Sequence, residues 1–161
     1  MQLPKMSSSF ASLPGHLLRR CHQIAVAIFL DECSVYDLTP LQFAVLIVLS
    51  EQGSQDQVTL GGEIALDRTT ITVVVRNLEE RGLILRDKSG RDQRSKIVSI
   101  TAAGQALLNQ VLPAVQQAQE RIMSPLKPEE SAQLLQLLEK LAEGNNALSR
   151  APVRKRKNRP H

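Results

Sequence analysis

Apolar residues near the start of the chain recur at three- and four-residue spacing, which predicts a helix that buries one face. This helix runs from Pro14 to about Cys33, with Pro14 at a first helical position and Ser12 as its expected cap. A polar break over residues 31–38 follows it. The apolar stripe consists of Leu17, Cys21, Ile24, Ala25, Ile28 and Phe29.

Further helices are predicted from similar spacing and from capping residues at their starts. They span residues 41–51, 60–65, 68–82, 102–123 and 128–148. The expected caps are Thr39, Thr59, Asp67 and Thr101. Helix 41–51 is apolar almost all round, so we expect it in the core. Pro113 lies inside the long helix 102–123 and is expected to bend it.

Two short runs have strand character. Residues 83–87 and 96–100 are joined by a charged segment in which Ser89-Gly90 supplies turn chemistry. Val58 is expected to add one more strand position. The predicted fold class is mainly α with a small β-hairpin wing, that is, a winged helix-turn-helix flanked by N- and C-terminal helices.

Composition narrows the function classes. The 161 residues are 42% hydrophobic but only 2% aromatic, so stacking surfaces for single-stranded bases are missing. The formal net charge is +4, and the twelve residues from Arg150 onwards contribute more than all of it, leaving the rest slightly acidic. Basic residues gather again between Asp67 and Lys96. Such local clustering is typical of a nucleic-acid surface.

Other classes lack the residues that they need. Cys21 and Cys33 belong to no metal-ligand spacing, and the histidines form no set with a nucleophile and an acid. We therefore expect no enzymatic activity, no metal and no cofactor. The chain has no signal-peptide core and no apolar run long enough to span a bilayer. A soluble, cytoplasmic protein without a membrane partner is expected.

Residues 59–82 have helix-turn-helix proportions, and the charged hairpin follows directly. Short and forked polar side chains in the first turns of helix 68–82 suit base edges and phosphates in a major groove. In the hairpin, Asp92 stands two residues before Arg94 and can orient its guanidinium for a narrow minor groove. The alternatives are a surface helix of another small α-domain and a solvated charged turn. The predicted DNA-binding residues are Thr59, Arg68, Thr69, Thr70, Thr72, Arg76, Arg91, Asp92, Arg94 and Lys96.

The run from Leu38 to Gly104 resembles the core of the MarR (multiple antibiotic resistance regulator) family. The resemblance is carried by LTPLQF at 38–43, by DRTT and LEERGLI within 67–84, and by DQR and IVSITAAG within 92–104. It implies a winged helix-turn-helix that binds double-stranded DNA, and with the flanking helices it covers residues 12–148. One departure is Val73, where many members carry Arg. A base contact at that position therefore cannot be carried over. Either Arg68 or Arg76 would compensate, or Val73 would pack against a thymine methyl.

The resemblance also implies a homodimer in which the first, fifth and sixth helices interlock. The sequence supports this independently, because helix 128–148 carries more Leu than a monomer covers. A monomer whose Leu-rich helix packs on itself is the alternative. A two-fold dimer would place its recognition helices on a pseudo-palindromic operator. The predicted organisation is a disordered N-terminus (1–11), dimerisation helices (12–37 and 102–148), a DNA-binding lobe (38–101) and a basic, disordered tail (149–161).

MarR-like regulators commonly bind small aromatic acids between the dimer layer and the DNA-binding lobe. Here two Arg and two His lie within about two turns at the start of the first helix, and an Arg grips a carboxylate well. This segment is similar to regulators of aromatic-acid catabolism, in particular of nicotinate degradation, which implies a hydroxylated nicotinic acid as effector. The alternative role of these residues is in caps and dimer salt bridges. The predicted ligand-binding residues are His16, Arg19, Arg20, Thr39, Gln42 and Phe43.

Our main hypothesis is a dimeric repressor that a small aromatic carboxylate releases from its operator. One alternative is a redox-sensing repressor that uses Cys21, whose basic neighbours favour a thiolate, although its place on the apolar stripe also fits an inert thiol. Another is a protein-interaction winged helix, against which the basic hairpin argues. The basic tail from Arg150 adds phosphate contacts or aids solubility.

Overall fold

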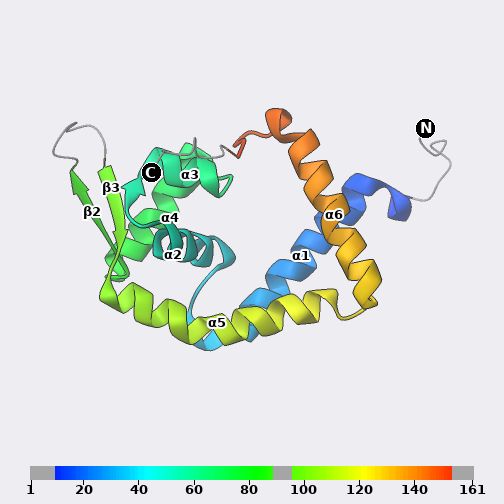
Figure 1. Ribbon diagram of the computed structural model, residues 1–161, viewed down its shortest axis with the longest axis horizontal. Coiled ribbons are helices and arrows are strands. Elements are labelled where there is room, and N and C mark those ends of the chain that lie inside the picture. The colour runs from blue at the N-terminus through cyan, green and yellow to red at the C-terminus, as the bar shows by residue number, and fades with distance from the viewer. Residues whose placement is uncertain (1–9, 89–95, 154–161) are drawn as a thin grey trace.

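The computed structural model describes residues 10–88 and 96–153, in which two groups of elements can be distinguished (Figure 1). Helices α2, α3 and α4 and a small sheet form one lobe, and α1, α5 and α6 extend away from it. The helices are α1 (Pro14–Glu32), α2 (Pro40–Gln52), α3 (Gln57–Glu63), α4 (Arg68–Glu80), α5 (Ala102–Met123) and α6 (Pro128–Gly144). The other elements are β1 (Gln55–Asp56), β2 (Ile84–Lys88), β3 (Lys96–Ile100) and the 3-10 helices η1 (Phe10–Ser12), η2 (Ser34–Tyr36) and η3 (Asn146–Leu148). The predicted fold class is confirmed.

The sheet has three antiparallel strands in the order β1-β3-β2. Ile84 pairs with Ile100 in the β2–β3 hairpin, and β1 pairs with the middle of β3. The prediction of a strand position at Val58 is wrong, because β1 lies before it and Val58 is already in the first turn of α3. The sheet thus ties the start of α3 to the hairpin.

Three predicted helix starts are confirmed. The side-chain oxygens of Thr39, Asp67 and Thr101 each accept a backbone N–H three residues further on. Thr39 also forms a capping box, because the Gln42 side chain accepts the Thr39 N–H in return. These caps fix where α2, α4 and α5 begin.

Two predicted caps are wrong. Asp56, and not Thr59, caps α3: its carboxylate accepts the N–H groups of Val58 and Thr59. The chain is still extended at Asp56, where β1 pairs with β3, so the helix starts there. At α1, Ser12 lies in η1, and the capping position is Leu13, which makes no side-chain cap.

The core lies where α2, α4 and α5 meet the sheet. As predicted, α2 is deeply inserted, with Val45, Leu46 and Leu49 buried. α1 packs against α5, but its apolar stripe is buried only near the end, at Phe29. Earlier members of the stripe, such as Ile24, are exposed in this single chain. The fully buried side chains include Leu60, Leu78, Ile84, Val98 and Leu108, and each such Leu or Ile stabilises the fold by about 2 kcal/mol.

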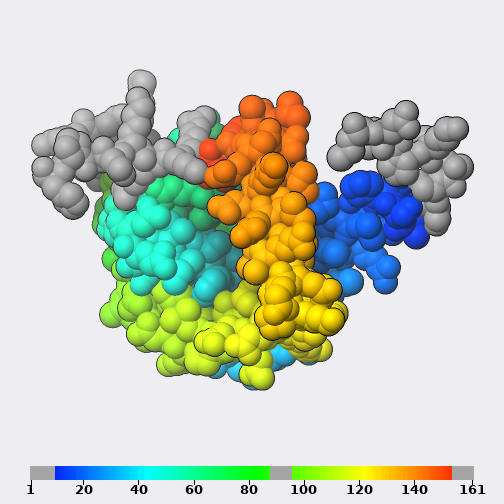
Figure 2. All heavy atoms as spheres, turned by 45° about the vertical axis from the view of Figure 1, so that its right-hand side comes forward, coloured from blue at the N-terminus to red at the C-terminus, as the bar shows by residue number. Residues whose placement is uncertain are grey.

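The last helix is shorter than predicted. α6 ends at Gly144 and is followed by η3, because Gly144 and two Asn residues favour a helix end over continuation to Leu148. No residue of α6 is buried. In the space-filling view α6 stands on the surface between the lobe and the start of α1 (Figure 2). None of the described helices is long and apolar enough to cross a membrane.

Candidate nucleic-acid interface

Helix α4 presents one apolar and one polar face. The face that the spacing predicts to point inward is buried, and it consists of Ile71, Val74, Val75 and Leu78. On the opposite face Arg68, Thr69, Thr72 and Arg76 are exposed, and Thr70 is half-buried. Val73 shares this outer face with 42% of its surface exposed. A helix held rigidly by its inner face and open on its outer face is suited to lie in a DNA groove.

The outer face of α4 is joined to α3 by a short hydrogen-bonded chain. Gln57 Nε2 donates to Thr72 Oγ1 at 3.0 Å, and Thr72 Oγ1 donates to the Arg68 carbonyl at 2.7 Å. The Thr72 hydroxyl proton is therefore already used within the protein. Its remaining lone pair and its methyl group are what Thr72 can offer to a base, and a thymine methyl suits the latter.

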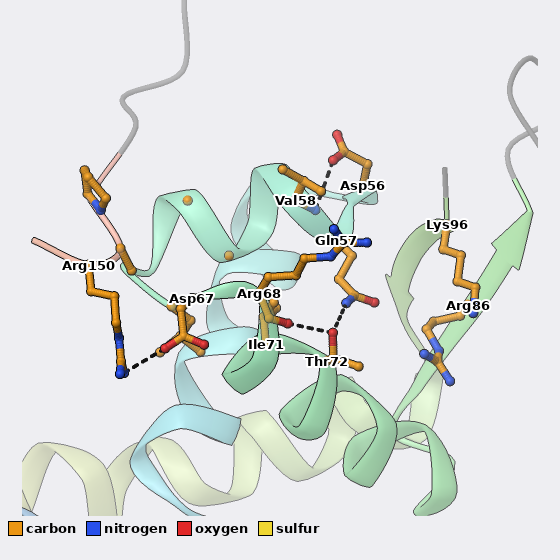
Figure 3. A pocket seen from close by; sticks show the side chains of 15 residues that line it. Asp56, Gln57, Val58, Asp67, Arg68, Ile71, Thr72, Arg86, Lys96 and Arg150 are labelled. Carbon is orange, nitrogen blue, oxygen red and sulfur yellow. Dashed lines mark hydrogen bonds and ion pairs between the residues drawn. The ribbon is translucent and has the colours of Figure 1, made fainter. Parts of the chain in front are cut away.

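A cleft of about 480 Å³ opens between α3, α4, the sheet and the chain after α6 (Figure 3). Four cationic side chains line it and spread from Arg150 past Arg68 to Arg86 and Lys96. The other lining residues are Asp56, Gln57, Val58, Gly61, Gly62, Leu66, Asp67, Ile71, Thr72, Ala151 and Pro152. With four cations and two carboxylates, the cleft is net positive and suits an anion such as a DNA phosphate.

Both carboxylates in the cleft are already engaged. For Asp67, hydrogen bonds from Thr70 hold its pKa below the ordinary value, with a smaller contribution from the charge of Arg150. For Asp56, burial works to raise the pKa, but hydrogen bonds from Thr59 and Val58 outweigh it and lower the pKa. Both groups are therefore anionic helix caps at neutral pH, and they leave the cleft cations in excess.

An ion pair connects α4 to the hairpin. Arg86 of β2 binds the carboxylate of Glu79 through both Nε and a terminal nitrogen. The hydrogen bond from Arg86 is the main reason why the pKa of Glu79 lies below its usual value, and the charge of Lys96 adds to it. This partly buried pair holds the hairpin at a fixed position relative to the outer face of α4.

The remaining predicted DNA-binding residues have different settings. The Thr59 hydroxyl donates to Asp56 at 2.6 Å, so it serves the start of α3. Arg76 is exposed one turn beyond Thr72, with Glu80 at 3.9 Å. Lys96 is exposed at the start of β3. The predictions at Arg91, Asp92 and Arg94 lie outside the described residues.

Sequence reasoning missed Gln57 and Arg86 on this surface, and it considered Arg150 only as part of a basic tail with phosphate contacts. Gln57 carries a usable signal, since it is a polar residue at the first position of the helix that packs against α4. For Arg86, which lies in a strand, and Arg150, which lies beyond the last helix, the clustering of charge does not show which part of the surface they reach. Their place in the cleft depends on contacts between distant segments.

The six predicted ligand-binding residues fall into two groups in the single chain. His16, Arg19 and Arg20 lie at the start of α1, where Arg19 contacts His16 and donates to Gln23. The other three open α2, and two of them, Thr39 and Gln42, form its capping box. Phe43 lies near Phe29, at the far end of α1, with the two rings tilted and their centroids 6.0 Å apart. His16 is thus roughly 20 Å along the helix from the point where α1 meets α2.

The two cysteines differ in setting. Cys21 is exposed on α1, and Cys33 is buried. Burial, with a smaller effect from the charge of Glu32, raises the pKa of Cys33 above its usual value, which makes this thiol inert. Over residues 10–88 and 96–153 no group of His, Cys, Asp and Glu is arranged to hold a metal ion.

Comparison with known proteins places this surface in context. Residues 38–96 match the model of the MarR family. The chain is 34% identical over 131 residues to the HTH-type transcriptional repressor NicR of Pseudomonas putida, covering 81% of this chain and 83% of NicR.

Two solved structures resemble the chain closely. BpsR of Bordetella bronchiseptica, whose DNA binding is regulated by 6-hydroxynicotinic acid, is 32% identical with a TM-score of 0.79, covering 84% of this chain and 96% of BpsR. The transcriptional repressor CouR, solved bound to a 23-mer DNA duplex, is 27% identical with a TM-score of 0.78, covering 88% of this chain and 99% of CouR.

Proposed function

Because the chain belongs to the MarR family and is a DNA-binding transcriptional repressor rather than an enzyme, we propose that it holds operator DNA in the cytoplasm through the outer face of α4 and is released by a small aromatic carboxylate. The observation that carries the DNA part is the cationic cleft beside the exposed face of α4. Arg68 and Thr72 lie on both the helix face and the cleft, which supports a role for them in contacting bases and phosphates together.

A homodimer fits this proposal. The exposed leucines of α6 and the exposed first half of the α1 stripe are apolar surfaces that a second copy would cover. Two-fold symmetry would then present two α4 helices to two half-sites of a pseudo-palindromic operator.

The DNA part is tested by binding assays with duplexes selected from a random pool. We expect Arg68→Ala to weaken binding by about tenfold or more, since it removes a phosphate or base contact. Thr72→Val keeps the methyl group but loses the hydroxyl, and should alter sequence preference more than affinity. Lys140→Ala, on the exposed surface of α6, is the matched control for the loss of one cation. If Arg68→Ala binds as tightly as Lys140→Ala, the proposed interface is wrong.

The effector part rests on the two groups of residues at the starts of α1 and α2. Because they lie apart in one chain, we propose that an effector site using both is completed by α1 of the second protomer. Arg19 and Arg20 would hold the carboxylate, and the aromatic ring would lie against Phe43.

The effector is sought by adding aromatic acids to the protein–DNA complex, beginning with 6-hydroxynicotinic acid because it regulates BpsR. We expect release of DNA together with a rise in Tm. The double substitution Arg19→Ala/Arg20→Ala should abolish both effects while leaving DNA affinity intact. Organic hydroperoxide, applied to wild type and to Cys21→Ser, tests the redox alternative. If hydroperoxide releases DNA from wild type but not from Cys21→Ser, and no aromatic acid releases it, the proposal of a carboxylate effector is refuted.

A further inference from the structure

The chain after α6 forms a structured turn that lies against the helix-turn-helix. We refer to residues 145–153 as the C-terminal strap. The Asn146 side chain closes it through two hydrogen bonds, accepting the Val153 N–H at 2.8 Å and donating to the Val153 carbonyl at 3.0 Å. The Ser149 hydroxyl accepts the Ala151 N–H at 3.1 Å. These bonds give the strap a defined shape.

The strap is docked at the N-terminal end of α4. Arg150 binds the Asp67 carboxylate at 2.8 Å (Figure 3), and Ala151 and Pro152 form part of the cleft wall. A second hollow lies where Ala65, in the turn between α3 and α4, faces the strap. The strap thus borders the surface that α4 offers to DNA.

The two charged groups differ in exposure. The Asp67 side chain is 21% exposed, whereas that of Arg150 is 86% exposed. One edge of the guanidinium therefore binds the Asp67 carboxylate at the start of α4, and its other donors face solvent. A guanidinium has five N–H donors, so it can hold a carboxylate and a phosphate at once.

The sequence that follows the strap is basic. Directly after the strap come Arg154, Lys155, Arg156, Lys157 and Arg159, with no acidic residue among residues 150–161. Val153, the last described residue, is held at the edge of the strap by Asn146. The basic segment therefore starts from a point fixed next to the α4 surface.

We propose that the C-terminal strap is a further DNA-contacting element, in which Arg150 bridges Asp67 to a backbone phosphate next to the half-site. This inference rests on the proposed DNA-binding function of α4. The ligand is the sugar–phosphate backbone of duplex DNA, so the strap adds affinity without reading sequence. The strap follows α6 in the chain and contacts the start of α4 through the ion pair of Arg150 with Asp67.

The test is the salt dependence of DNA affinity, measured with full-length protein on a duplex that wild type binds. Each phosphate contact that is lost lowers the slope of log K against log salt by about 0.9. We expect Arg150→Ala to lower the slope by about one. A chain ending at Ser149 removes Arg150 together with the rest of the strap, and should lower the slope by at least as much. Lys140→Ala should leave the slope unchanged.

The outcomes separate this inference from the function on which it rests. If wild type binds, Arg68→Ala weakens binding, and both Arg150→Ala and the truncated chain keep the wild-type slope, the strap does not contact DNA and the inference fails alone. If the truncated chain binds more tightly than wild type, the strap covers the interface instead and the inference is overturned. If neither wild type nor Arg68→Ala binds any selected duplex, the proposed function fails first. Circular dichroism of each variant confirms that helix content is retained.

Discussion

The carboxylate of Asp56 holds the first helix of the helix-turn-helix in place. It accepts the N–H groups of Val58 and Thr59 and the hydroxyl of Thr59. Partial burial opposes the charged form, but these hydrogen bonds favour it more and lower the pKa. The folded protein therefore binds this proton less readily than the unfolded chain, and the ionised carboxylate stabilises the fold.

This stabilisation has a defined pH window. It is fully present above the unfolded pKa, near 3.8, and is lost as the pH falls through the lower folded pKa. Asp56→Asn keeps a capping oxygen but has no charge, so we expect it to be less stable than wild type at pH 7 by about 1 kcal/mol. The difference should shrink as the pH falls below 3.8. Urea unfolding at pH 7 and pH 2.5 measures it.

Asp87→Asn on β2 is the control for the change in net charge. If the free energies of unfolding of wild type and Asp56→Asn differ by the same amount at both pH values, this explanation is wrong. It would mean that the shape of the cap, rather than its charge, stabilises α3.

Residue-scale prediction from sequence succeeded where the deciding interaction is local. Asp67 and Thr101 each accept an N–H three residues ahead, so a polar residue before an apolar run was sufficient to identify them. Asp56 and Thr59 are both good capping residues only three positions apart. The choice between them depends on how far β1 pairs with β3, which is a contact between distant segments.

At the scale of elements, the junction of α4, the hairpin and α5 is tightly packed around Gly104. The Leu83 carbonyl accepts the Thr101 N–H at 3.1 Å, and the Thr101 hydroxyl donates to the Gly82 carbonyl at 2.8 Å. A Cβ at position 104 would lie 2.1 Å from the Leu83 carbonyl oxygen. The start of α5 therefore approaches the strand backbone so closely that only glycine fits.

Gly104→Ala should accordingly be destabilising despite the higher helix propensity of Ala. We expect a loss of about 3 kcal/mol or more, since backbone must move to accommodate the methyl group. Gly144→Ala, at the end of α6 with nothing within 4 Å of its added Cβ, is the matched control. Thermal unfolding should place Gly104→Ala far below wild type and Gly144→Ala close to it. Equal Tm values for the two variants would show that the junction can relax.

The order, type and approximate bounds of the helices and of strands β2 and β3 were predictable, because apolar spacing and helix starts are local properties of the sequence, whereas β1 was missed. The half of the candidate interface on α4 was predictable for the same reason, since Arg68 and Thr72 are outward once Ile71 is inward. The other half was not. Arg86 and Arg150 reach the cleft through the strand pairing and the return of the strap.

At the scale of the whole molecule, the described chain leaves two helical faces without a partner. Leu135, Leu137 and Leu141 of α6 are each more than half exposed, and Leu17 and Ile24 of α1 are nearly half exposed. Exposed apolar surface of this extent on neighbouring helices is typical of an oligomer interface. It supports the proposed homodimer, in which two α4 helices are held at a fixed separation.

Charged residues in place of the exposed leucines of α6 should disrupt the proposed homodimer. Burying one Leu contributes about 2 kcal/mol, so Leu135→Glu/Leu138→Glu is expected to weaken dimerisation by about a hundredfold or more. Gln136→Glu, an exposed polar position on the same helix, is the control. Analytical ultracentrifugation at micromolar concentration distinguishes the two variants. A double variant that stays as dimeric as Gln136→Glu would exclude this face from the interface.

The sequence by itself determined the elements, the inner and outer faces of α4 and the family, because these follow from local spacing and short motifs. Only the tertiary structure decided that Asp56 starts α3, that Arg86 is paired to Glu79, and that Arg150 returns to Asp67. Each of these depends on segments that meet through strand pairing or helix packing. Their approach is set by the free energy of the whole fold and leaves no local pattern in the chain.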